Sequence, residues 1–150
     1  SPEHIHSLDR STPLADHARV DLELWGCPVN ARQVLGAIRD LLSGVAPVQS
    51  RDKVCVECKR IGHVCVLVAK GQPCMGPVTV TGCGVLCPSQ GRDCYGCYGP
   101  AERANPASLA ARFEALGLSD RDVARRFASI NSNAEAFAPA AEALRREDLR

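Results

Sequence analysis

The stretch from Cys55 to Pro100 reads CVECKRIGHVCVLVAKGQPCMGPVTVTGCGVLCPSQGRDCYGCYGP, and it decides how this chain can fold. Eight of the nine cysteines lie in it, interleaved with glycine and proline, so it has little room for long helices or strands. Their order is Cys55-x2-Cys58-x6-Cys65-x8-Cys74-x8-Cys83-x3-Cys87-x6-Cys94-x2-Cys97. We therefore expect something other than a hydrocarbon core to hold this region together.

The cysteine spacing indicates metal binding. Disulfides need an oxidising compartment, whereas two C-x2-C pairs without a visible secretory signal favour a metal. Eight thiolates suffice for two four-cysteine zinc sites. However, four of the cysteines stand singly, and single cysteines in turns suit a cubane, whose ligands come from several turns around it. The pattern favours two iron-sulfur clusters and leaves a zinc-stabilised binding module as the alternative.

Composition narrows the class of protein. A length of 150 residues suggests about one domain. Hydrophobic residues make up 45% and aromatic residues only 4%, so we expect an aliphatic core. With 18 basic and 17 acidic residues, the chain is too balanced to bind nucleic acid through phosphates. The longest uncharged run, Gly71 to Gly91, is rich in cysteine, proline and glycine, so no membrane-spanning helix is expected.

The flanks of the cysteine region show ordinary patterns. Val20 to Trp25 alternates apolar and polar residues, which predicts a half-buried strand. Asn30 predicts the N-cap of a helix that stops at Gly44, with apolar residues at helical spacing. In the last third, Asn105 and Ser119 predict the starts of a short pair of helices.

Three motifs resemble a known family. The run CMGPVT at 74–79 followed by Cys83, and the run CYGC at 94–97 followed by Gly99-Pro100, closely resemble the cluster-binding part of the small subunit of NiFe hydrogenases. The resemblance is greatest to the delta subunit of the cytoplasmic, NAD(P)-linked type, also called sulfhydrogenase. The turn Gly26-Cys27-Pro28 resembles one that these subunits share with the small cluster-bearing subunit of respiratory NADH dehydrogenase. The resemblance covers about residues 14 to 130.

The resemblance implies a ligand set for each cluster. It assigns to a distal 4Fe-4S cluster Cys55, Cys58, Cys65 and Cys74, and to a medial 4Fe-4S cluster Cys83, Cys87, Cys94 and Cys97. Many hydrogenases have a histidine at the place of Cys55. Cys27 would be a single ligand of a proximal 4Fe-4S cluster. No residue of this chain is expected to be catalytic.

The family carries the other three proximal ligands in a flavodoxin-like N-terminal part, and this chain has no cysteine before Cys27. We therefore expect a C-terminal portion of such a subunit, with the third cluster present only if the missing part is supplied. In a complete protein, Cys27 would be a plain buried thiol. The expected fold is α+β and largely irregular: a strand-helix remnant of a flavodoxin-like domain at 1–50, a ferredoxin-like two-cluster region at 51–100, and a helical tail at 101–150.

The implied function is electron transfer in a cytoplasmic complex. The resemblance implies a NiFe large subunit as one partner and flavin- and iron-sulfur-bearing, NAD(P)-linked subunits as the other. A cluster-bearing subunit of a non-hydrogenase oxidoreductase is the nearest rival. Glycines beside the ligands would let backbone N–H groups approach sulfur, or simply supply turns. His63 is expected near the clusters or at the surface, and Tyr95 and Tyr98 to shield the medial cluster or pack under a loop.

Overall fold

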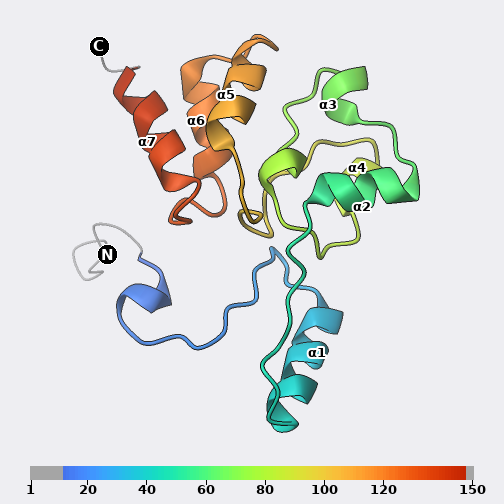
Figure 1. Ribbon diagram of the computed structural model, residues 1–150. Helices are drawn as coiled ribbons and strands as arrows, with labels where there is room; N and C mark the ends of the chain where they lie inside the picture. The colour runs from blue at the N-terminus through green and yellow to red at the C-terminus, as the bar shows by residue number, and fades with distance from the viewer. Residues whose placement is uncertain (1–11, 148–150) are drawn as a thin grey trace, which may run out of the picture.

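Short helices joined by irregular segments make up residues 12–147, the part of the chain that the computed structural model describes (Figure 1). The elements follow in the order η2 (Leu14–Asp16), α1 (Ala31–Leu42), α2 (Val54–Ile61), α3 (Val66–Ala69), η3 (Gly76–Val78), α4 (Leu86–Ser89), α5 (Pro106–Glu114), α6 (Asp120–Ala128) and α7 (Ala138–Glu147). The cysteine region thus contains only short helices, as its glycine and proline content predicts.

The strand expected at Val20–Trp25 is wrong, because residues 20–25 are irregular. A strand needs a neighbour to pair with its backbone N–H and C=O groups. In residues 12–147, extended pairing outside named strands consists of two isolated bridges, between Lys53 and Val80 and between Thr79 and Pro100. The described chain is mostly helical and irregular, which is compatible with a small α+β protein.

Helix α1 begins where the sequence predicts. The Asn30 side chain accepts a hydrogen bond of 2.8 Å from the Arg32 N–H, and Gly44 has a φ of 71° just beyond the end of the helix. The helix stands apart from the others in Figure 1, and apolar side chains along it are exposed, Leu35 by 68% and Leu42 by 85%. Helix α1 therefore adds little to the core of the described residues.

The described part of the tail, up to residue 147, contains three helices, one more than expected. Asn105 caps α5 by accepting from the Ser108 N–H at 3.0 Å, and Ser119 caps α6 by accepting from the Asp122 N–H at 3.2 Å. Helix α7 packs along α6 (Figure 1). None of the helices within residues 12–147 combines the length and apolar character needed to cross a membrane.

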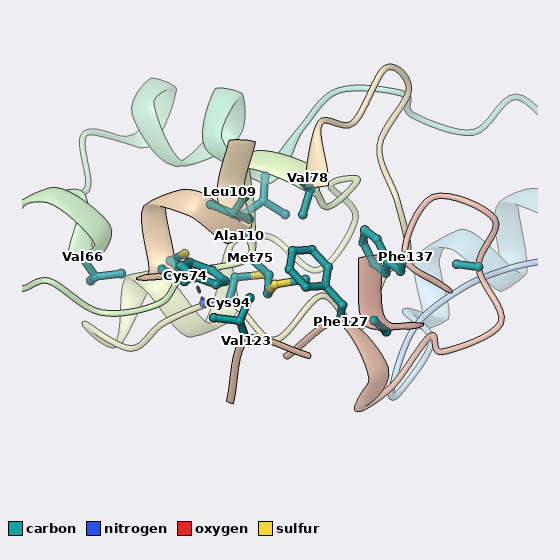
Figure 2. Packing of buried hydrophobic residues seen from close by; sticks show 14 of the residues in the cluster. Val66, Cys74, Met75, Val78, Cys94, Leu109, Ala110, Val123, Phe127 and Phe137 are labelled. Atoms are coloured by element: carbon teal, nitrogen blue, oxygen red, sulfur yellow. Dashed lines mark hydrogen bonds between the residues drawn. The ribbon is translucent and has the colours of Figure 1, made fainter. Parts of the chain in front are cut away.

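One hydrophobic core joins the cysteine region to the tail. Figure 2 shows Met75 of the cysteine region beside Cys94, with Phe127 of α6 on its other side. Most of the buried hydrophobic residues are aliphatic, as expected, but the largest fully buried side chains are aromatic: Phe113, Phe127 and Phe137. The Phe127 ring lies 6.4 Å from that of Phe113 and 5.9 Å from that of Phe137. The tail thus supplies the large side chains that the cysteine region lacks.

Candidate metal centres

Cys83, Cys87, Cys94 and Cys97, called here the second cysteine group, line one cavity of about 350 Å³. Cys87 lies on α4, and the other three lie in irregular segments on either side of it. Val85, between Cys83 and Cys87, is fully buried with a φ of 60°. A β-branched residue in this left-handed conformation costs about 1–3 kcal/mol and persists only where its surroundings fix it. The turn that presents these two thiols is therefore held by its packing.

Cys55, Cys58, Cys65 and Cys74, called here the first cysteine group, come from two helices and a loop. Cys55 and Cys58 lie one turn apart on α2, Cys65 is the N-cap of α3, and Cys74 precedes η3. Burial, together with the smaller effect of the charges of the other three thiols of the group, raises the pKa of the Cys55 thiol to about 11. The fold therefore brings these four side chains close enough to affect one another.

The two groups adjoin through Cys74 and Cys94. The Cys94 backbone N–H donates to the Cys74 Sγ at 3.3 Å, and the Met75 N–H donates to the Cys94 carbonyl at 2.9 Å. Cys74 and Cys94 are also the buried members of their groups, and the hydrogen bond between them is drawn in Figure 2. Each group therefore touches the other at its most buried residue.

Backbone N–H groups point at several of the sulfur atoms. The Gly96 N–H donates to the Cys94 Sγ at 3.5 Å, and the Gly76 N–H lowers the pKa of Cys74 against the stronger effect of its burial. A Cβ at Gly76 would lie 3.2 Å from the Cys55 Sγ and 3.4 Å from the Cys74 Sγ. Gly76 thus leaves room between two thiols of the first group.

Burial opposes the ionisation of several of the clustered thiols. Burial raises the pKa of Cys94 to about 12, although the Gly96 N–H and the Thr79 hydroxyl counteract part of the rise. Burial also raises the pKa of Cys58, Cys74, Cys87 and Cys97. A metal would have to displace these protons, and its positive charge supplies the drive to do so.

The shape of the site favours some thiolate-bound groups over others. In the part of the chain that the structure describes, no three or more cysteine, histidine or acidic side chains are gathered closely enough to hold one metal ion. The second group instead surrounds a cavity, with N–H donors on the sulfur of Cys94. Such a cavity lined by thiols fits a cluster of several atoms, and N–H donors to sulfur are a feature of iron-sulfur sites.

Cys27 lies at the edge of the second group. It lines the same cavity, its side chain is exposed, and its backbone N–H lowers the pKa of Cys97 against the effect of burial. The expectation of a buried thiol, made for a complete protein, is therefore wrong for the described chain.

The other residues singled out in the sequence differ in their burial and in their contacts. Tyr98 is buried, lines the cavity of the second group and donates its hydroxyl to the Pro28 carbonyl at 3.3 Å. Tyr95 is 37% exposed and lies instead beneath Arg126. His63 is half-buried, and its backbone N–H bonds to the Cys58 carbonyl at 3.1 Å.

Two tail residues that contact the Cys94–Cys97 loop were missed by sequence reasoning. Arg126 of α6 forms an ion pair with Asp93, and the Asn131 side chain donates to the Gly96 carbonyl at 2.6 Å. Both contacts span more than thirty residues of chain. No local pattern reports such a pairing, so only the fold reveals it.

Comparison with known proteins gives this site a context. No family model matches the chain. The chain is 40% identical over 116 residues to the delta subunit of sulfhydrogenase 2 of Pyrococcus furiosus, a match that covers 76% of this chain and 48% of the relative. It is 32% identical over 146 residues to a subunit of the F420-non-reducing hydrogenase vhu of Methanococcus voltae, covering 81% of this chain and 51% of the relative.

A third relative is named for its iron and sulfur. The chain is 30% identical over 146 residues to the iron-sulfur subunit of the F420-non-reducing hydrogenase of Archaeoglobus profundus, covering 77% of this chain and 45% of the relative. The chain thus spans about half the length of these curated relatives. Its homologues are hydrogenase subunits, and over about three quarters of its length the chain is similar to them.

Proposed function

We propose that this chain is an electron-transfer subunit of a NiFe hydrogenase complex, in which each cysteine group holds one 4Fe-4S cluster. The first group would hold the distal cluster and the second the medial one. The observation that carries the proposal is the cavity lined by the second group together with the hydrogen bond from Cys94 to the Cys74 Sγ. The names of the homologous hydrogenase subunits support it.

The residues of the chain would hold the two clusters and shield them from water. When bound, 4Fe-4S clusters supply one-electron oxidation and reduction. Backbone N–H donors at Cys94 and Gly96 place partial positive charge at sulfur, which favours added negative charge. The buried side chains of Met75, Val78 and Phe127 keep water from the joint between the groups. The chain needs no acid, base or nucleophile for this work.

The partners follow from the same resemblance. We infer that a NiFe large subunit exchanges electrons with this chain on one side, and a flavin- and iron-sulfur-bearing, NAD(P)-linked subunit on the other, in the cytoplasm. Cys27 would contribute one ligand to a proximal cluster whose other ligands come from outside this sequence. Its place on the rim of the second group supports this inference, because a proximal cluster there would adjoin the medial one.

An electron count tests the proposal. Protein reconstituted with iron and sulfide should accept about two electrons per chain in a reductive titration, one for each cluster. The Cys97→Ala variant should accept about one, because it removes a ligand of the second group only. Wild-type protein that binds zinc and accepts no electrons would overturn the proposal.

Association with a hydrogenase is a separate question. Purified under anaerobic conditions from its source cells, the chain should bring with it a large subunit that has paired C-x2-C nickel ligands at both ends. Co-purification with a different oxidoreductase, in the absence of such a subunit, would retain the electron-transfer function and contradict the hydrogenase assignment.

A further inference from the structure

Arg126 of α6 is held between a carboxylate and an aromatic ring of the cysteine region. Its guanidinium forms an ion pair with Asp93 and lies 5.2 Å from the centre of the Tyr95 ring. The Arg126 side chain is 24% exposed and that of Asp93 is 13% exposed. Other ion pairs in the described residues, such as Arg125 with Asp122, are far more open to solvent. Salt screens a partly buried pair much less than an exposed one.

Asp93 lies where the two cysteine groups meet. It directly precedes Cys94, whose N–H bonds to the Cys74 Sγ. Burial is the main cause of the raised pKa of Cys74 and Cys87, and the charge of Asp93 adds to the rise in both. The carboxylate therefore acts on one thiol of the first group and one of the second.

The tail fixes the position of the guanidinium. Arg126 lies on α6 between Val123 and Phe127, which are buried in the core. Beyond the end of the helix, the Asn131 side chain bonds to the Gly96 carbonyl, on the far side of Cys94. The tail thus contacts the loop that carries Cys94 and Cys97 at two points. These contacts lower the entropy cost of holding Arg126 in place.

We propose that Arg126 is a positioning residue of the electron relay: by neutralising Asp93 at the joint between the cysteine groups, it keeps the reduction potentials of both centres higher than they would otherwise be. Reduction adds negative charge, which an uncompensated carboxylate in a partly buried site opposes. The ion pair removes that opposition. This inference rests on the proposed function, and it assigns to the tail helices a part in setting the potential.

Charge-changing variants test it in the reconstituted protein, by potentiometric titration followed by visible and EPR spectra. Arg126→Gln should shift the midpoint potentials to more negative values, and Asp93→Asn should shift them to more positive ones. The double variant should return close to wild type. Arg126→Lys should retain most of the wild-type potential, because it keeps the positive charge, although it loses the planar stacking on Tyr95.

The matched control is Arg125→Gln, which removes the same charge from the neighbouring, exposed position of α6 and should leave the potentials unchanged. Equal shifts in Arg125→Gln and Arg126→Gln would overturn the inference, because net charge alone would then explain them. So would an iron-containing Arg126→Gln protein with wild-type potentials. If Arg126→Gln binds no iron, Asp93→Asn decides: an unchanged potential overturns the inference. Wild-type protein without iron would instead overturn the proposed function, and this inference with it.

Discussion

At the scale of single residues, burial and hydrogen bonding oppose each other at the cysteines. Cys94 is 5% exposed, and burial raises its pKa to about 12. The N–H groups aimed at Cys74 and Cys94 act in the opposite direction, because they stabilise negative sulfur. These N–H groups do not outweigh burial, so a positive metal centre is needed to stabilise the thiolate form. These surroundings support the proposal that the buried thiols are ligands.

Loss of Cys74 should affect the iron of the first cysteine group and not that of the second. Cys74→Ala removes one ligand of the first group and the acceptor of the Cys94 N–H. We expect the iron content to fall by about half, while the circular dichroism signal of the tail helices remains. Cys27→Ala is the control and should leave the iron content unchanged, because Cys27 belongs to neither group and both groups keep all four of their thiols. Unchanged iron in Cys74→Ala, or lost iron in Cys27→Ala, would show that the ligand grouping is wrong.

Gly76 should tolerate no side chain. A methyl group at this position would come within 3.4 Å of the sulfur atoms of Cys55 and Cys74, the two proposed ligands. We expect Gly76→Ala to lose the iron of the first group and keep that of the second, measured as iron per chain. Gly36→Ala is the matched control, because its added methyl group meets nothing within 4 Å. It should keep all the iron and stabilise α1 by up to about 1 kcal/mol.

At the scale of elements, local signals predicted the helices that have strong caps. Asn30, Asn105 and Ser119 were each predicted as an N-cap, and each accepts the expected backbone hydrogen bond. These bonds connect residues two or three positions apart, so the sequence reports them directly. The strand at Val20–Trp25 failed, because its alternating pattern says nothing about whether a partner strand exists.

Part of the candidate site, likewise, could be predicted from the sequence, and part could not. The family resemblance, not the spacing, divided the eight thiols into two groups, and the structure places the second group around one cavity. The hydrogen bond between the two cysteine groups and the ion pair of Arg126 with Asp93 depend on long-range packing. They could not be predicted, because no periodicity links position 93 to position 126.

Helices α6 and α1 should respond very differently to the loss of an apolar side chain. Phe127→Ala removes a ring at the centre of the core and should lower the free energy of unfolding by about 3–5 kcal/mol. Leu42→Ser removes a side chain that is 85% exposed and should change it by less than about 0.5 kcal/mol. Urea unfolding of the metal-free protein measures both. A large effect of Leu42→Ser would mean that α1 packs against the rest of the chain.

At the scale of the whole molecule, the cysteine region depends on its neighbours. Residues 51–100 contribute Val54, Met75 and Val78 to a core whose large side chains come from the tail. The three-part division at 50 and 100 remains a prediction, but the core contains residues from both sides of position 100. The tail therefore serves the cysteine region in two ways, by covering it with apolar rings and by compensating Asp93.

The central claim is that the eight clustered cysteines hold two iron-sulfur clusters, and the most direct test is metal and sulfide analysis of anaerobically prepared protein. We expect roughly eight iron and eight acid-labile sulfide per chain, with a broad visible absorption that bleaches on addition of dithionite. About two zinc per chain in colourless protein without sulfide would contradict it, and would identify the cysteine groups as structural zinc sites.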